Sequence, residues 1–163
     1  MEECISDIVI REFRRGDRER VNAFFDQMSG ETRAFFNVDD ENRKVAMKFF
    51  DGSPEHTVFF LAEHHGTMVG YLTLFHVDTL IPWLTIAVSE ELKGKKLGGR
   101  LMEFIIEYAR QKGMGGILLT TLSANIRAQS LYKRCGFDYM GTYMNGEQLH
   151  LLTFKRPSKN AGS

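Results

Sequence analysis

Residues 86–101 read IAVSEELKGKKLGGRL, and they are the most informative segment of this chain. Its apolar start predicts the end of a buried strand, and the apolar spacing over residues 98–111 predicts a helix. The loop between them contains three lysines and a glycine. Such a geometry binds phosphate, because the free N–H groups and the positive end of the helix dipole point outward, and glycine lets the backbone approach an anion.

Neither of the two common nucleotide-binding motifs is present, at this loop or at the glycine-rich segment after the helix. The Walker pattern fails, because Ser89 stands where its first glycine should be and Lys96 where its hydroxyl should be. The dinucleotide fingerprint fails at residues 113–118, because Leu118 occupies the last glycine position and the segment precedes a strand. A basic turn with a helix cap explains the loop equally well when it is taken alone.

The hydrophobic pattern on both sides of this stretch predicts one α/β domain over residues 1–155 and a loose tail over residues 156–163. The expected strands are residues 8–13, 57–63, 68–77, 81–88, 117–122, 137–143 and 148–155, and the expected helices are residues 18–28, 32–37, 39–50, 98–111 and 125–134. Asp17 is expected to cap the first helix. A strand, a helix and a strand over residues 81–122 predict parallel pairing, whereas the neighbouring hairpins predict antiparallel pairing. We therefore expect a mixed α+β fold with one twisted sheet of about seven strands and helices on both faces.

Composition excludes several classes of protein. The chain has 163 residues with 21 Lys and Arg against 21 Asp and Glu, so no broad attraction to nucleic acid or an anionic membrane is expected. With 43% hydrophobic and 26% charged residues, it resembles an ordinary globular protein rather than a disordered chain. No apolar run approaches the roughly 18 residues that a membrane helix requires. The acidic N-terminus, Met1 to Cys4, lacks the features of a secretory signal, so we expect a cytoplasmic protein.

Metal and disulfide sites are not expected from residue spacing. Cys4 and Cys135 are far apart in the sequence and form no Cys-x-x-Cys pair. The five histidines are His56, His64, His65, His76 and His150, and none falls in a recognised metal-binding spacing. We therefore expect a protein that needs no metal.

A second stretch supports a ligand-binding role for the basic loop. Residues 125–137 read NIRAQSLYKRCGF. Taken by themselves, these residues predict that Asn125 caps a helix, that Gly136 ends it, and that Tyr132 lies on nearly the same face as the cap. The stretch resembles the pattern Asn-x-x-Ala-x-x-Leu-Tyr-x-x-x-Gly-Phe of the GNAT superfamily of acyl-CoA-dependent N-acyltransferases, and every specified position matches.

The basic loop is similar to the acyl-CoA loop of the same superfamily, Arg/Gln-x-x-Gly-x-Gly/Ala, with two departures. Lys93 replaces Arg or Gln, and Lys96 replaces the first glycine, whereas Gly98 is kept. If Lys96 requires a positive φ, the substitution costs about 1 kcal/mol. We therefore expect weakened or rearranged cofactor binding rather than its loss.

The resemblance implies a GNAT-like fold, acetyl-CoA as co-substrate, and transfer of an acetyl group to a primary amine by direct attack on the thioester. Main-chain groups of Ile86 and Val88 would pair with the pantetheine arm, and Tyr132 would donate a proton to the CoA sulfur. The implied cofactor-binding residues are Ile86, Ala87, Val88, Lys93, Gly94, Lys95, Lys96, Leu97, Gly98, Gly99, Asn125 and Tyr132, with Tyr132 also catalytic.

The general base is missing from this interpretation. Many members of the superfamily carry a carboxylate on the strand before the loop, but residues 82–88 contain none. Asp78, His76 and His150 are the nearest candidates, and each is more often a turn or strand residue. Trp83 and the Phe35-Phe36 pair are expected either to border the acceptor site or to pack in the core.

Three functions remain open at this point. The first is an N-acetyltransferase, and the second is a CoA-binding module of the same fold without catalysis. The third is an unrelated nucleotide-binding domain, which does not account for residues 125–137. A small-molecule amine, a protein amine and a homodimer all remain open as partners.

Overall fold

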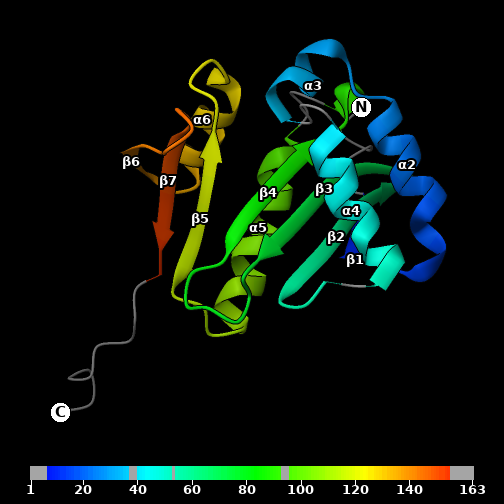
Figure 1. Ribbon diagram of the computed structural model, residues 1–163, viewed down its shortest axis with the longest axis horizontal. Helices are drawn as coiled ribbons and strands as arrows, with labels where there is room; N and C mark the ends of the chain where they lie inside the picture. The colour runs from blue at the N-terminus through cyan, green and yellow to red at the C-terminus, as the bar shows by residue number, and fades with distance from the viewer. Residues whose placement is uncertain (1–6, 37–39, 53, 93–95, 155–163) are drawn as a thin grey trace.

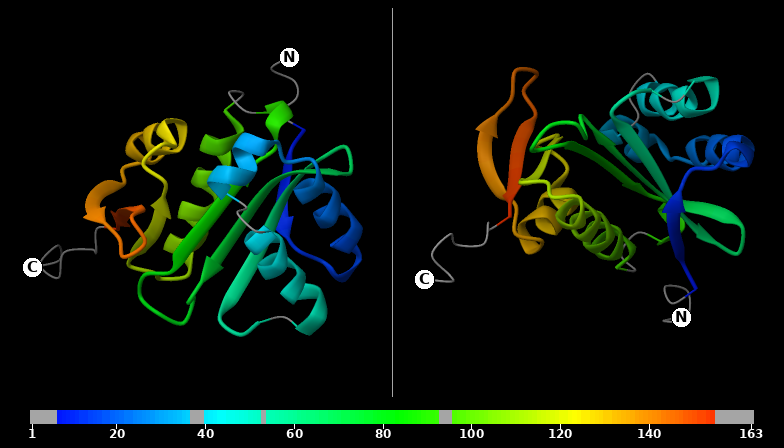
Figure 2. Two further views of the ribbon diagram at one scale, coloured as in Figure 1. Left: turned by 45° about the horizontal axis from the view of Figure 1, so that its top comes forward. Right: turned by 90° about the horizontal axis from the view of Figure 1, so that it is seen from below.

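The computed structural model describes residues 7–36, 40–52, 54–92 and 96–154, and they form a single mixed sheet with helices on both faces (Figures 1 and 2). The strands are β1 (Val9–Glu12), β2 (Thr57–His64), β3 (Thr67–Phe75), β4 (Trp83–Val88), β5 (Gly116–Thr121), β6 (Asp138–Thr142) and β7 (Gln148–Thr153). They lie in the order β1-β2-β3-β4-β5-β7-β6, and β4 and β5 run parallel whereas the other neighbours are antiparallel. The predicted seven-stranded mixed sheet is confirmed.

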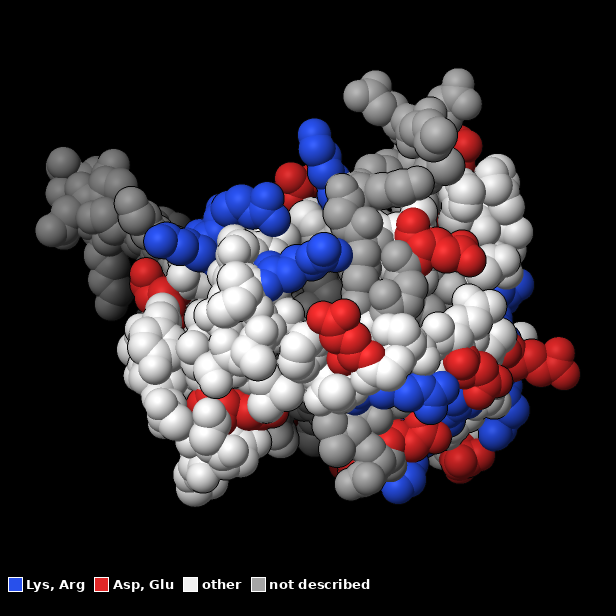
Figure 3. Space-filling model, turned by 90° about the horizontal axis from the view of Figure 1, so that it is seen from above, with Lys and Arg blue, Asp and Glu red and all other residues white. Residues whose placement is uncertain are grey.

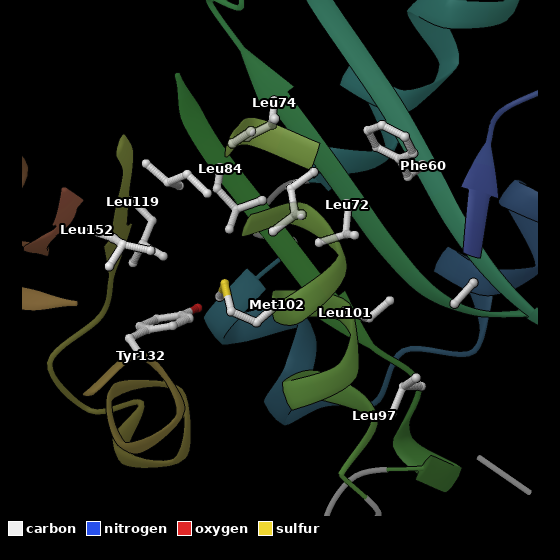
Figure 4. Packing of buried hydrophobic residues seen from close by; sticks show 14 of the residues in the cluster. Phe60, Leu72, Leu74, Leu84, Leu97, Leu101, Met102, Leu119, Tyr132 and Leu152 are labelled. Carbon is white, nitrogen blue, oxygen red and sulfur yellow. The ribbon is translucent and has the colours of Figure 1, made fainter. Parts of the chain in front are cut away.

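The helices close to the sheet divide between its two faces. They are α2 (Arg18–Asp26), α3 (Gly30–Phe36), α4 (Glu41–Gly52), α5 (Leu97–Gln111) and α6 (Ile126–Arg134), with the 3₁₀ helices η1 (Arg15–Asp17) and η3 (Glu90–Leu92). Side chains of α5 and α6 pack into one buried cluster with β2, β3, β4, β5 and β7 (Figure 4). Side chains of α2 and α4 form a second cluster on the opposite face, which is rich in phenylalanine. The apolar periodicity of the sequence predicted these faces.

Most predicted elements appear within a few residues of their expected bounds. The helix expected at residues 18–28 ends at Asp26, and the strand expected at residues 81–88 begins at Trp83. The expected tail, residues 156–163, lies outside the described residues, as does Asp39, one expected start of α4. Element boundaries vary in this way because helix and strand ends are set by tertiary contacts as much as by local pattern.

The predicted role of Asp17 was wrong. It is the residue before α2, but its side chain makes no cap hydrogen bond to that helix. Instead, its carboxylate accepts hydrogen bonds from Arg11 at 2.8 and 2.9 Å, from Arg20 at 2.6 Å and from the Arg14 N–H at 2.6 Å. Because only 2% of the Asp17 side chain is exposed, its charge is better compensated by two full positive charges than by the partial charge of a helix N-terminus.

The sheet is interrupted between β4 and β5. Trp83↔Leu118 is the register pair between them, and the Leu118 N–H donates to the Pro82 carbonyl at 2.9 Å. Beyond this pair the two strands diverge towards the end of the sheet where α6 lies (Figure 1). Strand pairing between β4 and β5 therefore stops beside the second half of β4, and we call this break in the pairing the gap.

Candidate active site

One wall of the gap is the unpaired edge of β4. At its end, the Ser89 N–H donates to the Val69 carbonyl at 2.8 Å. Main-chain groups alternate between the two sides of an antiparallel strand, so those of Ala87 face β3 as those of Ser89 do. The main-chain groups of Ile86 and Val88 consequently face the gap. Two of the three expected positions on this strand therefore present backbone hydrogen-bonding groups there, and the side chain of Ala87 packs in the cluster with α2 and α4.

The groups that are expected to bind phosphate lie at the start of α5. Lys96 is the residue before the helix and has φ 66° and ψ 10°, a left-handed conformation that favours glycine. The first helical hydrogen bond joins the Arg100 N–H to the Lys96 carbonyl at 3.2 Å, so the N–H groups of Leu97, Gly98 and Gly99 precede the helical ladder. Lys93, Gly94 and Lys95 lie outside the described residues.

The two glycines of α5 have different surroundings. A Cβ atom at Gly98 would lie 3.1 Å from Leu131 Cδ2, so glycine lets the first turn of α5 pack closely on α6. A Cβ atom at Gly99 would meet no atom within 4 Å among the described residues. Gly98 therefore serves helix packing, whereas the backbone at Gly99 is open to a ligand.

Asn125 caps α6 as predicted. Its side-chain oxygen accepts a hydrogen bond from the Ala128 N–H at 3.3 Å. The side-chain NH₂ group of Asn125 donates no hydrogen bond to another described residue. The cap thus fixes the orientation of the amide and leaves its donor side for another molecule.

Tyr132 lies between α6 and the sheet, with its hydroxyl directed towards Met102 of α5 (Figure 4). The residue is 6% exposed, and its ring centroid lies 5.8 Å from those of Phe137 and His150. Burial, with a smaller contribution from Cys135, raises the pKa of the Tyr132 hydroxyl above its ordinary value. The hydroxyl is therefore protonated at neutral pH and able to donate.

Two of the three candidate bases, His76 and Asp78, lie away from the gap. His76 and Asp78 lie in the loop before β4, at the end of that strand remote from Val88, and the His76 carbonyl accepts the turn hydrogen bonds of Thr79. His150 is 6% exposed, and its Nε2 atom lies 3.1 Å from Gln148 Oε1. Burial lowers the pKa of His150, which favours the neutral ring. His76 and Asp78 thus have the turn role that was the alternative for them.

Trp83 and Phe36, two of the aromatic residues expected near the acceptor site or in the core, each form a ring pair. Trp83 meets Tyr143, in the loop between β6 and β7, edge to face at 5.4 Å. Phe36 meets the fully buried Tyr71 edge to face at 6.2 Å. Both Trp83 and Phe36 are half-buried, so each packs against the protein and also reaches the surface.

Two features were missed by sequence reasoning. The Ser89 hydroxyl is buried at the end of β4 without a hydrogen-bond partner among the described residues. Its position directly after an apolar strand was the available signal. The second feature is a group of possible metal ligands, Asp7, His64 and His65, which lie together although their sequence spacing matches no known motif.

Comparison with known proteins shows the family to which this chain belongs. The profile described as "Acetyltransferase (GNAT) family" matches residues 18–137. A Schizosaccharomyces pombe protein described as an uncharacterized N-acetyltransferase is 32% identical over 120 residues, which cover 72% of each chain. The chain belongs to the GNAT family. As a GNAT protein it is an N-acetyltransferase by class (EC 2.3.1), and GNAT acetyltransferases use acetyl-CoA.

Solved structures show the same fold at low identity. The ribosomal-protein-S18-alanine N-acetyltransferase of Escherichia coli matches with a TM-score of 0.72 and 18% identity over 94% of this GNAT chain and 97% of its own. A spermidine N-acetyltransferase from Vibrio cholerae, solved with CoA and spermine, matches with a TM-score of 0.68 and 18% identity over 91% and 95% of the two chains. Among the described residues of the GNAT chain, no helix has the length and apolar character needed to span a membrane.

Proposed function

We propose that this chain transfers the acetyl group of acetyl-CoA to a primary amine that attacks the thioester directly. The observation that carries the proposal is the gap between β4 and β5. The unpaired backbone of Ile86 and Val88 faces this gap, and the side chains of both residues pack against the buried cluster that contains Tyr132.

The gap would hold the cofactor along its length. The pantetheine arm carries amide groups, and it would pair with Ile86 and Val88 as an added strand does. The pyrophosphate would lie at the start of α5, on the N–H groups of residues 97–99, with Lys96 and the expected lysines before it supplying charge. Figure 3 views this end of the molecule and shows several Lys and Arg side chains on the α6 side of it. A polyanionic cofactor is favoured by such a distribution.

The chemistry requires one proton donor and one uncharged amine. The amine nitrogen would attack the thioester carbonyl carbon, and a main-chain N–H of β4 would bind the carbonyl oxygen as negative charge develops there. As the new C–N bond forms and the C–S bond breaks, the departing thiolate would take the proton of the Tyr132 hydroxyl. The proton released by the nitrogen would return to Tyr132 through water. No base is assigned, because β4 carries no carboxylate.

The acceptor would enter from the side lined by the aromatic pairs. Trp83 with Tyr143 and Phe36 with Tyr71 border the sheet face opposite α5. Aromatic faces bind alkyl chains and attract ammonium groups. A small-molecule amine and a protein amine both fit this chemistry.

A CoA-binding module without catalysis is the second candidate. It is favoured by the left-handed Lys96, which stands where the superfamily has glycine, and by the missing carboxylate on β4. It predicts affinity for acetyl-CoA without turnover.

Acetyl-CoA titration by calorimetry, followed by a thiol-release assay against a panel of amines, tests both candidates. Tyr132→Phe should lower kcat by about 100-fold while the Kd for acetyl-CoA changes by less than about threefold, because a proton donor acts mainly in the transition state. Tyr139→Phe is the matched control, since Tyr139 is 58% exposed and also contacts the His150 ring. An unchanged kcat in Tyr132→Phe removes this residue from the mechanism. Binding without thiol release supports the module, and a folded protein that does not bind contradicts both candidates.

A further inference from the structure

The tip of the β2–β3 hairpin carries metal-ligating side chains that the acetyltransferase site does not use. Asp7, His64 and His65 each offer one ligand atom, and these atoms all lie within 4.8 Å of one another. We propose that these three residues bind a divalent transition-metal ion of the zinc class, which joins the segment before β1 to the β2–β3 hairpin.

Strand pairing brings Asp7 to this hairpin. β1 and β2 are antiparallel, and the register pair nearest the tip of the β2–β3 hairpin is Val9↔Glu63. The same register, continued two positions beyond the paired residues, brings Asp7 level with His65 at the hairpin tip. Strand pairing therefore explains why the segment that carries Asp7 lies beside this hairpin.

The turn conformation brings the two histidines together. Successive side chains of an extended strand point to opposite faces, so His64 and His65 would diverge if β2 continued. His65 instead has φ 50° and is followed by Gly66 with φ 81°, which is a left-handed hairpin turn. The ring centroids of His64 and His65 consequently lie 4.1 Å apart. A left-handed conformation costs a residue other than glycine about 1 kcal/mol, and Asn or Gly would adopt it more easily.

Hydrogen bonds hold both segments that carry the ligands. Arg20 Nε donates to the Gly66 carbonyl at 2.7 Å, which fixes the hairpin tip on α2. Arg100 donates to the Ile8 carbonyl at 2.9 Å, which fixes the segment beside Asp7 on α5. The neighbouring carboxylate of Glu63 is bound by Arg11 at 3.0 Å. The backbone positions of the three ligands are thus set without an ion.

The donor set selects the class of ion. Two imidazole nitrogens and one carboxylate oxygen suit Zn²⁺, which often takes three protein ligands and a water. Ligand atoms about 2.1 Å from a tetrahedral ion lie about 3.4 Å apart, so the three side chains must approach by up to about 1.4 Å. Asp7 and His65 are exposed and can rotate to do so.

Titration of the full chain with Zn²⁺ by calorimetry tests the site. We expect one equivalent of Zn²⁺ to bind and to raise the Tm. His64→Gln and Asp7→Asn should each weaken binding by at least about tenfold and abolish the rise in Tm. His65→Asn should do the same while it keeps a side chain that tolerates the left-handed turn.

His76→Gln is the matched control. His76 is also exposed and left-handed, with φ 60°, but it lies outside the cluster, so its variant should bind Zn²⁺ as the unmodified chain does. Co²⁺ in place of Zn²⁺ should give a tetrahedral absorption spectrum that Asp7→Asn loses. The proposal is overturned if the unmodified chain binds no Zn²⁺, if Asp7→Asn binds as tightly as the unmodified chain, or if His76→Gln loses as much affinity as His64→Gln. Circular dichroism of each variant confirms that it is folded.

Discussion

The sheet has two parts, β1 to β4 and β5 to β7, and strand pairing is more complete within the first part than across the boundary between the two. β1 to β4 are paired antiparallel along most of their lengths, whereas β4 and β5 share the single register pair Trp83↔Leu118. The helix α5 packs under this boundary and contacts both parts of the sheet through side chains such as Met102, which is fully buried (Figure 4). A sheet can therefore stop forming strand pairs without coming apart when a helix core covers the break, and the unpaired backbone becomes available to a ligand.

The parts also differ in their cores. The part with β1 to β4 buries an aromatic cluster in which Phe13 lies within 6.0 Å of the rings of Phe49, Phe50, Phe59 and Tyr71. The part with β5 to β7 ends at β6, an edge strand on which Tyr139 and Met140 are 58% and 55% exposed. We infer that the first part supplies most of the stability and the second part completes the site.

The largest effect is expected in the aromatic cluster. Phe13→Ala should lower the free energy of unfolding by about 4 kcal/mol, because a buried ring is replaced by a cavity. Urea unfolding measures the change. Tyr139→Ala removes an aromatic ring from the other part and should cost less than about 1 kcal/mol, since that ring is exposed. Equal costs would show that the two parts do not differ in this way.

A smaller loss is expected where β5 pairs with β7. A Cβ atom at Gly116 would lie 2.1 Å from the Leu152 carbonyl oxygen, so Gly116→Ala must push the two strands apart. We expect a cost of about 3 kcal/mol, measured by urea unfolding. Gly16→Ala is the control, because a Cβ atom there meets nothing within 4 Å. Hydrogen exchange in Gly116→Ala should be faster in β5 and β7 than in β2 and β3, and uniform acceleration would argue against a separable second part.

The ion pairs of the buried Asp17, in the first part of the sheet, should make the free energy of unfolding fall at acid pH. The Arg11 guanidinium, with the Arg14 N–H and Arg20, lowers the pKa of Asp17 to about 2 from 3.8. The charged carboxylate is thus favoured in the folded state, so its stabilisation is complete above about pH 4 and is lost as the pH falls through about 2. Asp17→Asn should cost about 2 kcal/mol at pH 7 and remove that part of the acid sensitivity, measured by urea unfolding between pH 2 and 7.

Asp51→Asn is the control for this prediction. Asp51 pairs with Arg18 at 2.8 Å, but its side chain is 65% exposed, so its removal should cost less than about 0.5 kcal/mol. A similar loss in both variants would mean that burial of Asp17 contributes nothing.

The smallest effect is expected at the entrance to α5. Lys96→Gly should raise the free energy of unfolding by up to about 1 kcal/mol, because glycine adopts the φ of 66° without strain. His76→Gly, with φ 60°, should give a similar increase. Only Lys96→Gly should change acetyl-CoA affinity, by about threefold towards tighter binding, because it restores the glycine that the superfamily's acyl-CoA loop has at this position. Equal affinities in the two variants would remove Lys96 from the cofactor site.

Local pattern was sufficient for the elements and for part of the site. The strand, loop and helix of residues 86–111 follow from apolar spacing, and the Asn125 cap follows from a short polar side chain three residues before Ala128. These interactions join residues close in the sequence. Asp17 shows the limit of this reasoning, because its partner Arg11 lies on a strand and competes with the helix for the same carboxylate.

Residue types and their short spacing were enough to predict the order of the elements, the faces of the helices and the two motifs that resemble the GNAT superfamily. Three features could not be read from local pattern: where β4 and β5 separate, that Lys96 is left-handed, and that Asp7 lies near His64 and His65. These features depend on strand register and on how α5 packs beneath the sheet, and both are set by contacts between residues far apart in the chain.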